Sequence, residues 1–174
     1  MRGLLFLLLA LPFLCNAQNY LIKEGVPSDL DKNKIIFLKH GKIRVTAVKD
    51  SSEQQDYLHL RQTNHNDIIK ESNSKLKVAA LEYPFPYIIA NKSNYEPLVK
   101  AGYKYLLDSR AYNYDNLAVQ PAEDELIIYE FFIRDLTTNV AYKVFELDEM
   151  KIYDGKLIIK KLNKAVKKQF PDAY

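Results

Sequence analysis

The alternation of apolar and polar residues along the chain predicts most of its strands. Residues 35–38 are continuously apolar, as in a strand that is buried on both faces. Over residues 42–48 apolar and polar positions alternate, which predicts a second strand that pairs back on the first through a tight turn at His40 and Gly41. Further strands are expected at residues 85–90, 103–109, 125–136 and 140–147, the last two as an antiparallel hairpin.

Apolar residues that recur with a period near 3.6 predict the helices. The first is expected from about residue 67 to residue 82, where Pro84 stops it. A short helical piece over residues 93–102 ends at Gly102. The last helix is expected from about residue 153 to residue 170, with apolar residues on one side and lysines on the other.

These elements together predict an α/β or α+β fold, with a single mixed β-sheet of about five strands and helices packed on it. Their order is β(β)αβαβ-ββα. A strand–helix–strand unit requires a right-handed parallel crossover, whereas the later hairpin is antiparallel, so the sheet is mixed. Residues 34–174 are expected to form one globular domain. The polar residues 18–33, which Gly25 and Pro27 interrupt, are expected to be a loosely held, flexible N-terminal arm.

Residues 1–17 have the residue order of a secretory signal peptide. Arg2 precedes an apolar run well short of the ~20 residues that span a bilayer, and a small residue, Ala17, follows the run. We therefore expect cleavage between Ala17 and Gln18, export to the periplasm or the extracellular space, and no transmembrane segment after cleavage. In an alternative interpretation Cys15 carries the lipid of an outer-membrane lipoprotein, although bulky residues precede it.

Cysteine content and charge exclude several classes of function. Cys15 is the only cysteine, so the mature chain would have no disulfide, no cysteine nucleophile and no cysteine-based zinc site. The formal net charge of the whole chain is only +3, which argues against a general nucleic-acid binder.

No pattern in the sequence indicates catalysis, a metal site or a cofactor. The three histidines, His40, His59 and His65, lack a metal-ligand spacing, and with five glycines no glycine-rich phosphate loop is present. The alternative is a hydrolase or transferase that uses a carboxylate such as Glu123 or Asp148 together with a histidine. That alternative requires these groups to converge in one cleft.

The last helix carries a one-sided array of lysines, with no acidic residue to balance it. As a functional surface it would contact anionic lipid or a polyanionic glycan. The simpler interpretation, which we favour, is a terminal helix packed on the sheet with a solvated outer side. The array, called here the lysine face, consists of Lys156, Lys160, Lys161, Lys164, Lys167 and Lys168.

Tyrosine is enriched, with thirteen tyrosines and no tryptophan. In a strand, Tyr83, Phe85, Tyr87 and Ile89 would point to one face, as expected for a sheet packed under helices. The tyrosines of the irregular stretch that follows residue 109 cannot be explained by packing in a strand. If the protein has a ligand surface, we expect it there. Its candidate binding residues are Arg110, Tyr112, Asn113, Tyr114 and Asp115.

Two prolines, Pro84 and Pro86, precede the strand at residues 85–90 or lie within it. Because their missing N–H groups lie on the same side of a strand, we expect a sheet edge, or a strand whose pairing starts only at Tyr87. Both prolines follow an aromatic residue, which predicts a cis peptide bond before one of them.

The stretches YPFPYIIA and YEPLVKAGYKYLLDS, the short turn DLTTN and a leader that ends in NAQ resemble small exported proteins of Bacteroidota that have no assigned function. The resemblance implies export and an α/β domain, and it supplies no catalytic residues. We therefore expect a non-catalytic binding or interaction module whose partner is an envelope protein or a glycan. A further alternative is an envelope-associated accessory factor that uses the lysine face.

Overall fold

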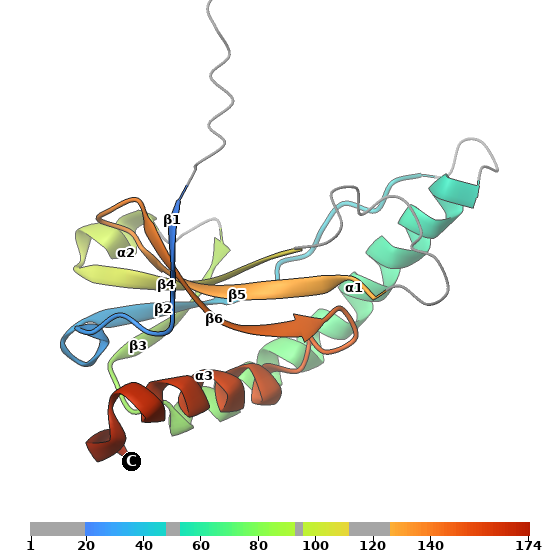
Figure 1. Cartoon of the computed structure of the whole chain (residues 1–174). Coiled ribbons are helices and arrows are strands. Elements are labelled where there is room, and N and C mark those ends of the chain that lie inside the picture. The colour runs from blue at the N-terminus through green and yellow to red at the C-terminus, as the bar shows by residue number, and fades with distance from the viewer. Residues whose placement is uncertain (1–19, 48–52, 93–95, 112–125) are drawn as a thin grey trace, which may run out of the picture.

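Six strands form a single mixed sheet in the computed structural model, which describes residues 20–47, 53–92, 96–111 and 126–174 (Figure 1). The strands are β1 (Leu21–Glu24), β2 (Lys34–Lys39), β3 (Tyr87–Asn91), β4 (Tyr103–Ala111), β5 (Ile128–Asp135) and β6 (Val140–Asp148). The helices are α1 (Glu53–Ala79), α2 (Glu96–Lys100) and α3 (Gly155–Gln169), with short 3-10 turns at Leu30–Lys32, Ala80–Glu82 and Pro171–Ala173.

The strand order is β1-β6-β5-β4-β2-β3. β2 pairs in parallel with both β3 and β4, whereas β5 is antiparallel to both of its neighbours, and β1 lies parallel to β6 at the other edge. The predicted α/β class and the mixed sheet are confirmed. The sheet has six strands rather than about five because residues 21–24 add an edge strand.

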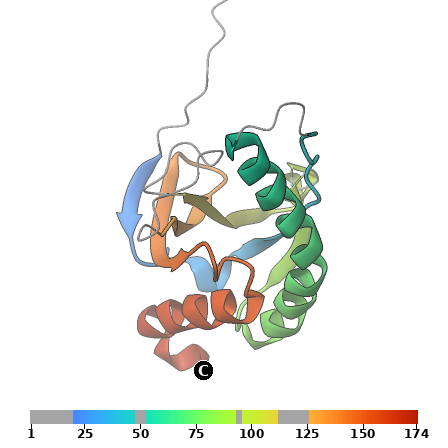
Figure 2. The same ribbon diagram turned by 90° about the vertical axis from the view of Figure 1, so that its right-hand side faces the viewer.

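Helices α1 and α3 pack beside each other on one face of the sheet (Figure 2). Alternate residues of the central strands β2, β4 and β5 point toward these helices. The helix predicted over residues 153–170 is confirmed, and Asp154 caps it by accepting a hydrogen bond from the backbone N–H of Leu157. The core between the layers includes Ile35, Phe37, Tyr105, Leu107, Phe131, Ile133, Leu76, Ile159, Leu162 and Val166.

The two helices are in close contact where Gly155 faces Leu76. A Cβ atom at Gly155 would lie 2.5 Å from the backbone nitrogen of Leu76 and 2.6 Å from its Cα. Only glycine leaves room for this contact, so Gly155 sets how closely α3 approaches α1.

The expectation for the two prolines was half right. β3 is an edge strand that starts at Tyr87, and the carbonyl of Pro86 accepts a hydrogen bond from Ile35. The described residues contain no cis peptide bond, so the cis prediction is wrong. The Tyr83 ring packs edge-on against the rings of Phe85 and Tyr87, and all three residues belong to the core or pack against it.

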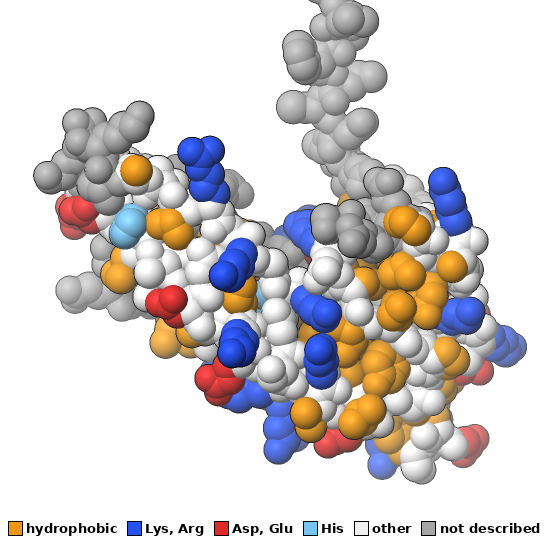
Figure 3. All heavy atoms as spheres, turned by 180° about the vertical axis from the view of Figure 1, so that it is seen from behind, with side chains coloured by type: hydrophobic (Ala, Val, Ile, Leu, Met, Phe, Trp, Pro, Cys, Tyr) orange, Lys and Arg blue, Asp and Glu red, His pale blue; other side chains and the backbone are white. Residues whose placement is uncertain are grey.

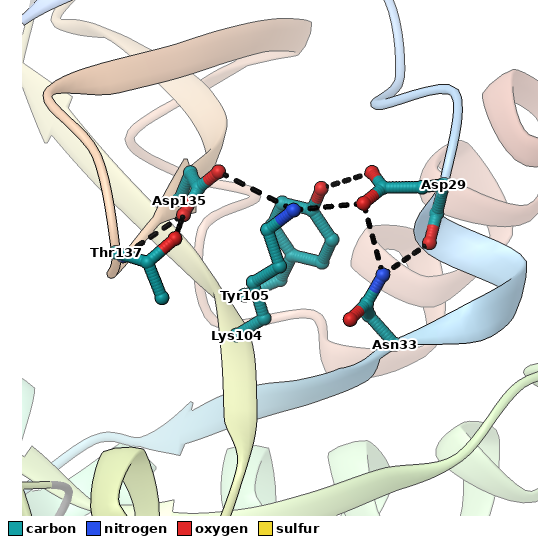
Figure 4. Close-up of polar contacts among 6 residues, drawn as sticks. All are labelled: Asp29, Asn33, Lys104, Tyr105, Asp135 and Thr137. Atoms are coloured by element: carbon teal, nitrogen blue, oxygen red, sulfur yellow. Dashed lines mark hydrogen bonds and ion pairs between the residues drawn. The ribbon is translucent and has the colours of Figure 1, made fainter.

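The part of the expected arm that the structure describes, residues 20–33, is held firmly. It contains β1, and both Pro27 and Leu30 are fully buried. Asp29 accepts hydrogen bonds from Lys104 Nζ at 2.7 Å and from the Tyr105 hydroxyl (Figure 4). The hydrogen bonds from Lys104 and then Tyr105 lower the pKa of Asp29. Polarity alone suggested a flexible arm, but a few buried apolar residues and one carboxylate fix it to the sheet.

The strand expected over residues 42–48 is wrong. The described residues of this segment have no strand pairing, and residues 40–46 instead run along α1. α1 itself begins at Glu53, fourteen residues before the expected start. The segment does not pair as a strand because polar side chains of α1 take up the backbone hydrogen bonds of residues 40, 41, 43 and 46.

Candidate ligand-binding site

Strands β2 and β4 are neighbours whose connections leave in opposite directions. After β2 the chain passes through α1 to β3, and after β4 it continues to β5 on the other side. Ligands of open α/β sheets bind outside the carboxyl ends of the strands at such a switch point. The pairing of β2 with β4 ends at Phe37 and Leu107, while β4 continues to Ala111, so the two strands diverge there.

A cavity of about 700 Å³ lies where these strands diverge. Its volume is within the range of roughly 300–1,000 Å³ that is usual for small-molecule sites. The cavity is called the crevice below. Apolar side chains line its interior, namely Phe37, Leu38, Leu76, Leu107, Phe131, Ile152 and Ile158. Polar and charged residues also line it, namely Lys39, His40, Lys42, His65, Ser72, Asn91, Lys92, Asp108 and Ser109.

Residues 40–46, called the strap below, form one wall of the crevice through residues 40–43. The side-chain amide of Asn73 accepts a hydrogen bond from the N–H of His40 and donates one to its carbonyl, both at 2.9 Å. Asn66 does the same for Ile43, at 3.0 and 2.9 Å. One side chain thus satisfies both backbone groups of a strap residue, as a neighbouring strand would.

Three more contacts extend this arrangement along α1. The N–H of Thr46 donates to Gln62 Oε1 at 2.6 Å, and its carbonyl lies 2.9 Å from His59 Nδ1. The carbonyl of Gly41 lies 2.9 Å from His65 Nε2. The strap therefore has hydrogen-bond partners along its length although it belongs to no sheet.

His40, His65 and Tyr153 meet at the crevice. His65 Nδ1 lies 2.8 Å from the Tyr153 hydroxyl, and the His40 ring centroid lies 5.0 Å from that of Tyr153. Burial, and then the nearby His65, lower the pKa of His40, whereas burial raises the pKa of Tyr153. His40 is therefore favoured as a neutral imidazole.

Acid–base catalysis finds little support in this arrangement. In the described part of the chain no carboxylate hydrogen-bonds to the His40 or His65 ring, and Asp148 pairs with Lys151 at 2.6 Å. Glu123 lies outside the described residues. The described residues contain no group of three or more His, Cys, Asp or Glu side chains that could hold a metal ion.

Three lysines, Lys39, Lys42 and Lys92, give the crevice a basic rim and are called the rim lysines below. None of them forms an ion pair with a carboxylate of the described residues. The one carboxylate in the lining, Asp108, pairs with Arg134 at 2.6 Å and accepts the Ser109 N–H at 2.9 Å. The rim is therefore net positive.

The candidate residues of the irregular stretch are only partly described. Arg110 belongs to the end of β4, where it pairs with Glu130 at 3.2 Å and lies over the Phe132 ring. It is not part of the crevice lining. Tyr112, Asn113, Tyr114 and Asp115 lie outside the described residues, as do Cys15, Ala17 and Gln18.

All six side chains of the lysine face are exposed, and the opposite side of α3 is buried in the core. No carboxylate of residues 20–47, 53–92, 96–111 and 126–174 forms an ion pair with them. Lys167 lies over the Tyr174 ring. The apolar side of α3 is thus used for folding, and only its charge is available to a partner.

The sequence interpretation missed the crevice and its wall. A signal was present, because His59, Asn66 and Asn73 recur every seven residues and so share one side of α1. Seen from behind, hydrophobic side chains also gather on the side of the molecule that carries β3 and α2 (Figure 3). Nothing in the described residues indicates what would cover that patch.

Comparisons with protein-family models, curated proteins and solved structures gave no match. The resemblance to exported Bacteroidota proteins stays a prediction. None of the helices in the described residues has the length and apolar character needed to cross a membrane.

Proposed function

We propose that the mature chain is an exported, non-catalytic binding module that holds a small ligand in the crevice. The observation that carries this proposal is the cavity of about 700 Å³ at the carboxyl ends of β2 and β4, where the two strands diverge. Its lining combines an apolar interior with polar and charged groups that could orient a ligand.

The polar groups around the crevice favour binding over chemistry. Both ring nitrogens of His65 already have partners, in Tyr153 and the strap. Asp108 is engaged by Arg134 and by its neighbour's backbone N–H. A catalytic group must instead reach a reacting atom with a free donor or acceptor.

The test is native mass spectrometry of the mature protein purified from its own cell envelope. We expect a small molecule to co-purify with the wild type. Ser109→Phe places a ring in the crevice at an exposed strand position and should abolish this co-purification. Thr138→Phe, exposed in the β5–β6 turn at the opposite end of the sheet, is the matched control and should retain the ligand. Equal retention in both variants would refute the crevice as the site.

A second candidate function is attachment to an anionic envelope surface through the lysine face. The supporting observation is that six exposed lysines on one helix lack ion-pair partners among the described carboxylates. Retention on anionic vesicles that disappears in moderate salt would support this function. Failure to bind them at low salt would exclude it.

A further inference from the structure

We propose that the crevice ligand is a single-chain amphiphile, with an apolar tail inside the crevice and an anionic head group at the rim lysines. This inference rests on the proposed function and names the chemical class of its ligand. It follows from three features of the crevice, namely its interior, its walls and its rim.

The interior offers surface to an apolar chain. Phe37, Leu107 and Phe131 come from three adjacent strands, and Leu76 and Ile158 come from the two helices that cover them. These side chains pack in the core and are at most 7 % exposed, so only a small part of each faces the crevice, as a fixed apolar floor. An apolar chain placed against them would leave water at roughly 0.8 kcal/mol per CH₂ group.

The walls explain why an apolar chain suits the crevice better than a peptide. An extended peptide binds a strand edge through free backbone donors and acceptors. Here the backbone groups of His40 and Ile43 are taken by Asn73 and Asn66, and the N–H of Ser109 is taken by Asp108. An apolar tail can therefore cover these walls without leaving any of those groups unsatisfied.

The rim selects the sign of the head group. Lys39 extends from β2, Lys42 from the strap and Lys92 from the end of β3, so three elements converge on one rim. The charge of Asp108 is already compensated by Arg134. A carboxylate or phosphate head would find three ammonium groups without ion-pair partners among the described carboxylates, whereas a cationic head would be repelled.

The experiment measures binding of dodecanoate to the full mature protein by calorimetry, below the concentration at which micelles form. Dodecyl maltoside and dodecyltrimethylammonium serve as neutral and cationic probes with a linear tail of nearly the same length. We expect one dodecanoate per chain, bound about tenfold more tightly than the neutral probe, and no measurable binding of the cationic probe.

Matched variants locate the site. The triple variant Lys39→Ala, Lys42→Ala and Lys92→Ala should weaken dodecanoate binding about tenfold. The control triple variant Lys160→Ala, Lys164→Ala and Lys168→Ala removes the same charge from α3 and should bind as the wild type does. Because all six side chains are half-buried or exposed, both variants are expected to fold, which circular dichroism checks.

Anionic vesicles distinguish a free amphiphile from a bilayer. If the rim lysines bind a free amphiphile, the triple variant of the rim lysines should lose affinity for dodecanoate. Any binding to vesicles should then fall only in the triple variant of Lys160, Lys164 and Lys168. Vesicle binding that falls in the rim variant, with no binding of dodecanoate, would overturn the proposal.

The inference and the proposed function can fail separately. Equal affinity for all three dodecyl probes, or no binding of any, would refute the anionic amphiphile. A native ligand that is lost in Ser109→Phe would still support the crevice as a binding site in that case.

Discussion

Asn66 and Ile43 are joined by two hydrogen bonds, in which a side-chain amide of α1 serves both the N–H and the carbonyl of an extended residue. Asn73 repeats this relationship with His40 one step along the strap. These pairs hold the strap on α1 and away from the sheet, and so they keep the crevice open between β2 and β4.

Asn73→Ala should therefore destabilise the protein. The variant leaves the part-buried N–H and carbonyl of His40 without their partner, which should cost about 1–3 kcal/mol in the free energy of unfolding. Urea unfolding followed by circular dichroism measures the change. The control is Ser74→Ala, because the exposed hydroxyl of Ser74 bonds only within its own helix, and that variant should stay within about 0.5 kcal/mol of the wild type. Equal effects of both substitutions would mean that the strap contacts add no stability.

Gly155→Ala should be more harmful than a single methyl group suggests. The new Cβ would lie 2.5 Å from the Leu76 backbone, so α3 must move away from α1, at a cost of about 1–3 kcal/mol. Thermal unfolding of this variant is compared with that of Gly41→Ala, whose Cβ would meet nothing within 4 Å. We expect Gly41→Ala to match the wild type or to exceed it by up to about 1 kcal/mol. If Gly155→Ala is as stable as the wild type, α3 and α1 can move apart at this contact without loss of stability.

Asp29→Asn should remove a pH-dependent part of the stability. The pKa of Asp29 is lowered in the folded chain, chiefly by the hydrogen bond from Lys104. Its contribution is therefore complete above the unfolded pKa of about 3.9 and is lost as the pH falls through the folded pKa. The melting temperatures of wild type and variant should differ near pH 6 and converge only as the pH falls below the lowered pKa of Asp29 in the folded chain. Asp172→Asn, near the C-terminus, is the control. A difference that is constant over this pH range would contradict the assignment.

Arg61→Ala should loosen the first turns of α1 without unfolding the domain. Arg61 pairs with Glu149 at 2.9 Å and donates to the Tyr57 and Tyr129 hydroxyls, so it ties this part of α1 to the sheet. Hydrogen exchange should accelerate over residues 53–65, with little change in the core strands. Arg44→Ala removes an exposed arginine from the strap and serves as the control. Unchanged exchange in α1 would indicate that other contacts hold it.

The sequence predicted those elements whose signal is local. The alternation around Tyr103–Ala111 and Val140–Asp148 identified β4 and β6, and the one-sided apolar pattern identified α3. In each of these elements residues at the strand or helix period face the core, so the period of its apolar residues carries the information.

The remaining features depend on partners that are distant in the sequence. Residues 42–47 alternate like a strand, yet their hydrogen bonds go to α1, which no local pattern could reveal. β1 is exposed at all four positions and so has no apolar pattern to detect. The crevice depends on where β2 and β4 stop pairing, which is a property of the sheet and not of either strand.

The hydrogen bonds of the strap also fix the number of residues between His40 and Thr46. His40, Ile43 and Thr46 are three residues apart, and their partners Asn73, Asn66 and His59 are seven residues apart in the reverse direction. Seven helical residues rise about 10.5 Å, and three extended residues span about 10 Å. The spacing of polar side chains on α1 thus fixes the number of residues in the strap. Inserting or deleting one residue between His40 and Thr46 would move every later strap residue away from its hydrogen-bond partner on α1. This match of two repeats sets where the strap, and with it one wall of the crevice, lies along α1.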